Sequence, residues 1–506
     1  MLGAKLTCLL ALLIISCTAA RASVEWLEAL LAQEPTVGSG LAKVLGTELV
    51  GEGENVAQAT VELQYLDVTG EPKTGKARLF VPQGAGADGS KAPLMLFAHY
   101  ECDPGGALHW CRRGWAVATT HENGEHCLGN SFNLDLALIE WVRRLPFVDR
   151  THLAIAGGSA GGYMALAMTA EAFPVAGTSA DVPVLNWAYN GGYLLRNGPL
   201  AAAGLGDPPD LTQSPLPVVA VVLPIGQGAQ QLFGNTPDAP AWRALSPVCY
   251  LDRITGPVSL TFSTADMLVP MPQLSLEHVR PPDPALFPGG FEMSLEACTA
   301  DPAMRTPLLD VLPQAKRAVF AIPIGDEYYE LTAENVLDPE HHPLPPAPPG
   351  IDRPFDPQKQ WSIVIYDEGA PLPHVGHLRH HLAQGPESFM EHIRQAPLPV
   401  DLLTLPKLGR LMERTQGALP DSPPLMGEGV DGARPVHRLN FVALEQLDVV
   451  TGLLDYADCS AEHAARLQSL YGELPPGAKA FGDALQLDAL RAWRDELLSR
   501  AREVVR

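Results

Sequence analysis

The sequence contains no run of basic residues. It has 35 lysines and arginines against 58 aspartates and glutamates, which gives a formal net charge of −23 at pH 7. The phosphate backbone of a nucleic acid repels such a surface unless a local basic patch offsets it. We therefore expect no nucleic-acid partner, and the acidity mainly indicates a soluble protein.

Long apolar runs are also missing. The longest begins after Lys5 and covers about ten residues, whereas a helix needs about 20 to cross a bilayer. A short apolar run behind a positive charge and before small residues is typical of an N-terminal targeting segment. We assign residues 1–22 to a signal peptide, which predicts an exported protein.

Two cleavage patterns fit this segment. Ala20-Arg21-Ala22 suits ordinary signal peptidase and would leave a protein that begins at Ser23. Residues 14–17, Ile-Ile-Ser-Cys, resemble a bacterial lipobox, which would leave a lipidated Cys17 that attaches the chain to a membrane. The two alternatives predict a periplasmic or extracellular protein in the first case and a membrane-anchored lipoprotein in the second.

Metal-binding spacings are absent too. Neither Cys-x-x-Cys nor His-Glu-x-x-His occurs, although cysteines and histidines gather between 99 and 127. Eight cysteines are present, and six remain after Cys8 and Cys17 of the targeting segment are removed. Six cysteines can pair in 15 ways, so the sequence does not choose between disulfides and buried thiols. We predict no metal and no organic cofactor.

What the sequence does contain is Gly157-Gly158-Ser159-Ala160-Gly161-Gly162. An apolar run, 152–156, precedes it, and a helix-like stretch, 163–172, follows. This order, in which a strand is followed by Gly-x-Ser-x-Gly and then by a helix, predicts a nucleophile elbow. The elbow is a sharp turn that exposes the serine hydroxyl. Glycines are needed beside the serine because strand and helix pass very close together there.

Further apolar segments at 93–99, 115–119, 257–262 and 361–366 predict strands around this elbow. They are separated by helix-like stretches, a pattern that favours a parallel sheet. Upstream, 57–66 and 77–81 alternate apolar and polar residues around two glycines, which predicts an antiparallel hairpin that opens the sheet.

This order resembles the α/β-hydrolase superfamily, and within it the catalytic domain of the prolyl oligopeptidase family and related serine esterases. The resemblance is carried by Gly-Gly-Ser-Ala-Gly-Gly-Tyr-Met at 157–164 and by Asp266-x-x-Val269-Pro270. It covers about 55–395 and implies a mostly parallel central sheet flanked by helices. Residues 23–54 are expected to form a helical segment and 396–506 a helical C-terminal extension.

Two stretches interrupt this pattern, near 180–245 and 271–360. Long segments between core strands are usually lids or caps, so we expect two cap-like insertions.

A serine hydroxyl needs a general base, normally a histidine oriented by a carboxylate. The superfamily order of serine, acid and histidine implies Ser159, then Asp266, then a histidine after the last core strand. Relatives often carry Asp-Glu-Gly-His there, but here a proline-bearing insertion follows the glycine. His377, which follows Gly376, is favoured as the base, and His374 is the alternative.

The oxyanion of the reaction needs two hydrogen-bond donors. One is the N–H of Ala160, the residue after the nucleophile. The second is expected in the turn after the 93–99 strand, where the N–H of Tyr100 is the candidate and its side chain a weaker one.

These residues predict an exported serine hydrolase that cleaves an ester or amide bond of a small ester or short peptide through an acyl-enzyme. The 55 or so residues upstream cannot hold the propeller of prolyl oligopeptidases, which favours an esterase-like relative. The alternatives are a serine peptidase and a non-catalytic binding protein on the same fold.

Overall fold

The computed structural model describes residues 24–32, 42–51, 55–67, 72–86, 89–125, 127–143, 145–171, 175–202, 240–251, 254, 256–281, 284, 291–325, 355–368 and 389–396. The predicted signal peptide, both candidate histidines and nearly all of the predicted C-terminal extension lie outside the described residues.

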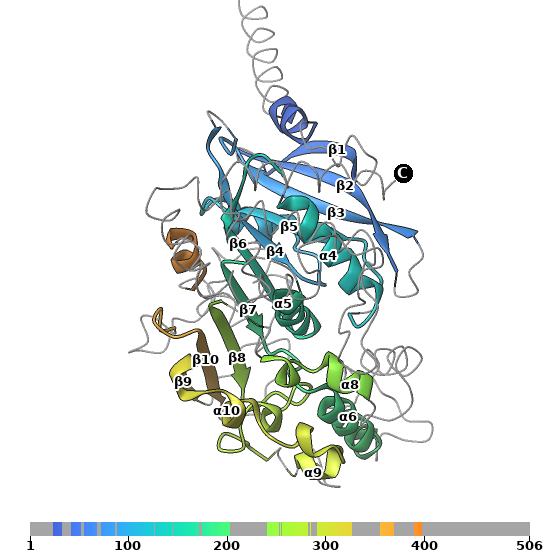
Figure 1. Ribbon diagram of the computed structural model, residues 1–506, viewed down its shortest axis with the longest axis vertical. Coiled ribbons are helices and arrows are strands. Elements are labelled where there is room, and N and C mark those ends of the chain that lie inside the picture. Colours follow the sequence, from blue (N-terminus) through green and yellow to red (C-terminus); the bar gives the residue numbers. More distant parts are fainter. Residues whose placement is uncertain are drawn as a thin grey trace, which may run out of the picture.

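The described strands form a ten-stranded sheet that runs the length of the molecule (Figure 1). Its order is β1-β2-β3-β5-β4-β6-β7-β8-β10-β9. The strands are β1 (Ala42–Val50), β2 (Val56–Leu66), β3 (Pro72–Pro82), β4 (Ala92–Phe97), β5 (Ala116–His121), β6 (Val148–Gly158), β7 (Gly177–Asp181), β8 (Val258–Ser263), β9 (Arg317–Gly325) and β10 (Trp361–Glu368).

The first strands are antiparallel. β1 pairs with β2, β2 with β3, and β3 with β5 in this sense, and Val61 lies opposite Ala77 in the β2–β3 ladder. This is the predicted hairpin. β1 was not predicted: a helix covers only 24–31, and 42–50 form a strand instead of continuing the expected helical segment over 23–54. The backbone groups along the outer edge of β2 take β1 as their partner, which outweighs the helical pattern read from the sequence.

The remaining seven strands are parallel, from β5 through β4, β6, β7, β8 and β10 to β9. Described helices lie on most of the connections between them, as expected for parallel neighbours. The helices that border the sheet or the site are α3 (Pro104–Cys111), α4 (Asn130–Val142), α5 (Ala160–Glu171), α6 (Trp187–Ala202), α8 (Pro240–Leu245), α9 (Leu295–Cys298) and α10 (Leu308–Val311).

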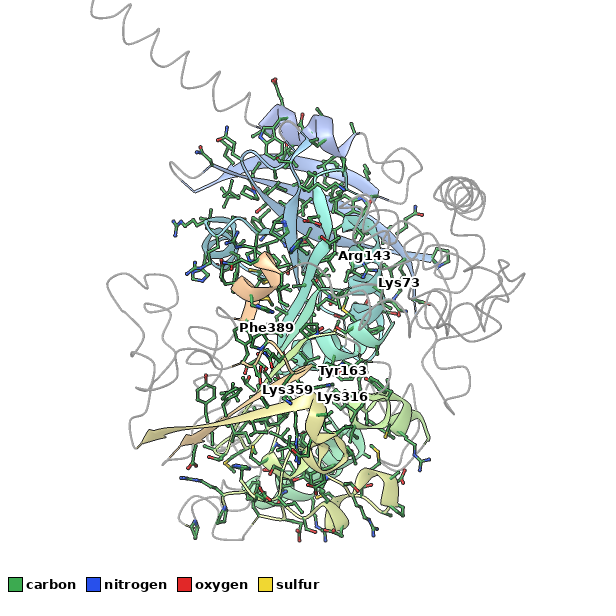
Figure 2. The ribbon with its side chains drawn as sticks, turned by 60° about the vertical axis from the view of Figure 1, so that its left-hand side comes forward. Lys73, Arg143, Tyr163, Lys316, Lys359 and Phe389 are labelled. Carbon is green, nitrogen blue, oxygen red and sulfur yellow. The ribbon has the colours of Figure 1, made fainter. Side chains whose placement is uncertain are left out.

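The sheet buries both faces. Within β4, Leu94 and Leu96 belong to one apolar core and Met95, between them, to a second. The first core contains side chains of α4 and α5, and the second contains α3 and the helix over 389–395. Figure 2 labels one residue from each side, Tyr163 of α5 and Phe389. Burial on both faces explains the continuous apolar runs of these strands.

Described parts of the two insertions pack against each other in one layer, formed by α6 and the segment around α9 (Figure 1). The Asn197 side-chain amide exchanges two 2.8 Å hydrogen bonds with the backbone of Glu292. The Tyr189 hydroxyl donates to the Met293 carbonyl at 3.2 Å. The sequence predicts two separate insertions, whereas in the structure their described parts are in contact.

Two adjacent glycines of α6 test this packing. A Cβ added at Gly192 would lie 2.1 Å from the Cys298 carbonyl oxygen, whereas a Cβ at Gly191 meets nothing within 4 Å. We expect Gly192→Ala to destabilise the fold by about 2–3 kcal/mol, because backbone must shift to admit the methyl group. Gly191→Ala should be neutral or stabilising by up to about 1 kcal/mol. Thermal unfolding of both variants measures the difference, and equal melting temperatures would contradict the α6–α9 contact.

Candidate active site

Ser159 occupies the sharp turn between β6 and α5. Its φ is 54°, in the left-handed region that residues other than glycine rarely adopt. The residue is partly exposed. Its N–H donates to the Asp181 carbonyl at 2.8 Å, and its own carbonyl accepts from Tyr163 at 3.0 Å, in the first turn of α5. The turn is therefore fixed on both sides of the serine.

The glycines around the serine are required by close backbone contacts. A Cβ at Gly157 would lie 2.3 Å from the Gly161 carbonyl oxygen, and one at Gly161 would lie 2.4 Å from the Ala98 carbonyl oxygen. A Cβ at Gly162 would lie 2.7 Å from the Asp181 carbonyl oxygen. Three segments, the ends of β4, β6 and β7, thus meet α5 with no room for side chains.

Strained backbone conformations cluster at the carboxyl edge of the parallel strands. Within the described residues, four non-glycine residues have positive φ: His99 (70°), Glu122 (52°), Ser159 (54°) and Val182 (40°). They follow β4, β5, β6 and β7, which are adjacent parallel strands, so all four lie at the carboxyl edge. Strained residues persist where the surrounding structure holds them, and they cluster at functional sites.

Tyr100 reaches Ser159 through its side chain. A hydrogen bond joins the Tyr100 hydroxyl to Ser159, and the residue as a whole is 52% exposed. Partial burial raises the pKa of Tyr100 above its ordinary value, the nearby Cys127 adds to the rise, and the hydrogen bond to Ser159 opposes it. A raised pKa keeps the hydroxyl protonated, and therefore able to donate, at neutral pH.

The Tyr100 N–H, our first candidate for the second oxyanion donor, is engaged elsewhere. It donates to the Ala98 carbonyl at 2.9 Å across a γ-turn centred on His99. The hydroxyl of the same residue faces the serine instead. The N–H of Ala160 lies in the first turn of α5, where backbone donors have no acceptor within the helix.

Asp266 follows β8 and is 3% exposed. Its Oδ1 accepts the N–H groups of Leu268 at 2.8 Å and Val269 at 3.1 Å, which is what the Asp-x-x-Val-Pro segment provides. The Asp266 carboxylate interacts electrostatically with Tyr193, which is itself buried. Burial mainly, and the Asp266 charge in addition, raise the pKa of Tyr193 above its ordinary value.

The segment with His374 and His377 lies outside the described residues, but the strand before it does not. β10 is parallel to its neighbour β8, and the Thr264 N–H donates to the Tyr366 carbonyl at 3.0 Å. The chain therefore leaves β10 at the edge where Asp266 follows β8.

Gln273 was not singled out in the sequence. It is 1% exposed, and its Oε1 accepts the N–H groups of Leu185 at 2.8 Å and Asn186 at 3.2 Å. The same residue thus links the acid loop to the start of α6, 88 residues away in the sequence. No local pattern indicates a contact over that separation.

Neither a metal-ligand cluster nor a disulfide occurs in the described residues. These residues contain no group of three or more side chains suited to a metal ion, and none of their five cysteines forms a disulfide with another. Burial raises the pKa of Cys111 to about 12, so its thiol stays protonated. No helix in the described ranges has the length and apolarity to cross a membrane.

Residues 107–193, which include the elbow, match the prolyl oligopeptidase family. Among curated proteins, none matches the sequence. Solved structures that align with the chain include an acylaminoacyl peptidase of Pyrococcus horikoshii (17% identity, TM-score 0.30, covering 46% of this chain and 42% of that one). An acetyl xylan esterase from Paenibacillus sp. R4 also aligns (18%, TM-score 0.32, 48% and 78%).

The chain adopts the α/β-hydrolase fold. The strand order, with antiparallel strands first and a parallel sheet covered on both faces, agrees with the predicted fold class. This α/β-hydrolase chain spans only 42% of the length of two acylaminoacyl peptidases that align with it.

Removing the Tyr100 hydroxyl tests its contact with the nucleophile. We expect Tyr100→Phe to lower kcat for a nitrophenyl ester by about 10²–10³ while KM changes little, since an oxyanion donor acts mainly in the transition state. Steady-state kinetics measure both constants. A kcat within about twofold of the wild type would show that the hydroxyl does not act in the reaction.

Proposed function

We propose that this chain is an exported serine hydrolase that cleaves an ester or amide bond with a Ser159-Asp266-His377 triad. The observation that carries the proposal is the strained, partly exposed Ser159 at the start of α5, hydrogen-bonded to Tyr100. The match of 107–193 to the prolyl oligopeptidase family supports the same reaction class.

In the proposed reaction, the histidine takes the Ser159 hydroxyl proton while the serine oxygen attacks the substrate carbonyl carbon. The carbonyl oxygen becomes an oxyanion that accepts hydrogen bonds from the Ala160 N–H and the Tyr100 hydroxyl. The histidine then gives the proton to the leaving alcohol or amine, which leaves an acyl-serine. Water attacks that ester with the same base, so the acid is released and Ser159 regains its proton.

A small or slender substrate fits the described surroundings. Tyr193 lies within electrostatic range of Asp266, and its ring packs against the ring of Tyr189 with centroids 5.9 Å apart. Both belong to the layer that α6 forms with the segment around α9. The hydrogen bonds between the Asn197 side-chain amide and the Glu292 backbone hold this layer together. Because this layer is closely packed, we propose that small esters are preferred over folded proteins, and we place esterase activity first.

A second candidate is a peptidase for short peptides. It is favoured because the residues that match the prolyl oligopeptidase family, 107–193, include the nucleophile segment. A panel of acyl nitrophenyl esters and aminoacyl amides of matched acyl size separates the two. Faster turnover of esters alone is not diagnostic, because esters are the more reactive substrates. Turnover of aminoacyl amides at a comparable kcat/KM would identify the peptidase.

Covalent labelling tests the nucleophile. We expect a fluorophosphonate to label the wild type and not Ser159→Ala, because the probe needs the activated hydroxyl. The same substitution should lower kcat by about 10⁴ or more. Ser90→Ala, at an exposed serine bonded to the Gly84 carbonyl, is the control and should label normally. Unlabelled wild-type protein that is fully folded would favour a binding protein on the same fold.

The base is tested by comparing two histidines. We expect His377→Ala to abolish turnover and His374→Ala to retain most of it, since His377 follows the glycine as in related hydrolases. The wild-type rate should rise between about pH 6 and pH 8, because an imidazole must be neutral to accept the serine proton. Loss of activity in His374→Ala alone would move the base to that residue.

A further inference from the structure

A carboxyl group from α4 reaches the turn that carries Tyr100. Asp135 is completely buried, and its Oδ2 accepts the N–H of His99 at 2.8 Å, across 36 residues of sequence. Its Oδ1 has no hydrogen-bond partner in the described part of the chain. Burial raises the pKa of Asp135 to about 8, and the bond from His99 opposes that rise. A buried carboxyl with one unsatisfied oxygen costs stability, so a contribution to function would explain its presence.

The turn that Asp135 holds is strained. His99 has a φ of 70°, and the γ-turn around it brings the Tyr100 N–H to the Ala98 carbonyl. A non-glycine residue in such a turn costs about 1–3 kcal/mol and relaxes unless neighbours hold it. The Asp135 carboxyl supplies the acceptor for the one backbone N–H at the centre of the strain.

The same helix also holds the ring of His99. Ser131 lies four residues before Asp135, on the same face of α4, and its Oγ is 3.0 Å from His99 Nδ1. Asn123 fixes Ser131 in turn, with its Nδ2 donating to the serine Oγ at 2.8 Å. The backbone and the ring of His99 are therefore both attached to α4.

The His99 ring packs against the Tyr100 ring and so restricts its position. The two rings meet edge-to-face with centroids 4.5 Å apart, so a rotation of the His99 ring moves the tyrosine ring. β5 holds the other side, because the Thr119 hydroxyl donates to the Tyr100 carbonyl at 3.3 Å. Tyr100 itself is half exposed.

We infer that Asp135 is a positioning residue for the oxyanion site: together with Ser131 it keeps His99 in its strained conformation, and His99 directs the Tyr100 hydroxyl to Ser159. The inference rests on the proposed function and adds to it a residue that touches neither substrate nor nucleophile. It gives α4 a part in catalysis beyond covering the sheet.

A pair of substitutions separates positioning from charge. Asp135→Asn keeps a carbonyl oxygen as acceptor for the His99 N–H, and Asp135→Leu removes it. We expect Asp135→Leu to lower kcat for 4-nitrophenyl acetate by about 10–100-fold with KM changed less than about threefold. Asp135→Asn should stay within about threefold of the wild type. Equal kcat for all three proteins, or equal losses in both variants, would overturn the inference.

The decisive measurement repeats Asp135→Leu in a Tyr100→Phe background. If Asp135 acts through the tyrosine hydroxyl, the substitution should cost less than about threefold there, because no hydroxyl remains to be directed. An undiminished loss in that background would show that Asp135 only supports the fold. If Asp135→Leu does not fold, Ser131→Ala replaces it in the same cycle, with a smaller expected loss that must also vanish with Tyr100→Phe.

Failure of this inference is distinct from failure of the proposed function. Ser159-dependent fluorophosphonate labelling in the wild type tests the nucleophile alone. If labelling succeeds while the Asp135 loss persists without the Tyr100 hydroxyl, the hydrolase stands and the positioning role is wrong.

Discussion

The close approach of backbone segments around Ser159 is the constraint on which the rest of the site depends. Gly157 and Gly161 pack so tightly that a single methyl group at either would lie within 2.4 Å of a carbonyl oxygen. Because Gly161 packs on the Ala98 carbonyl, the elbow and the turn after β4 have one relative position. That contact brings Tyr100 to the nucleophile, although 59 residues separate them in numbering.

The carboxyl edge of the sheet concentrates strain that the core supports. Four adjacent parallel strands each end in a non-glycine residue with positive φ, among the residues described. Their strands are buried on both faces, so apolar burial stabilises the conformations that these ends adopt. A rigid sheet thus fixes the serine, the tyrosine turn and the acid loop.

Contacts between distant segments complete the surroundings of the site. Gln273 joins the acid loop to α6, and Asn197 joins α6 to the segment before α9. Each uses a side-chain amide to satisfy backbone groups that the loops leave without partners in regular structure. The described parts of the two insertions therefore belong to one layer, and Tyr193 of that layer lies within electrostatic range of Asp266.

The sequence by itself determined the elbow at Ser159, the opening hairpin and the parallel strands, because each depends on residues within a few positions of one another. It also indicated Asp266, through a segment whose N–H groups bind the carboxylate locally. Only the tertiary structure decided that Ala42–Val50 is a strand, that the Tyr100 hydroxyl faces the serine and that Asp135 holds His99. Those outcomes depend on partners as far as 59 residues away, and no local periodicity encodes which distant side chain fills a gap.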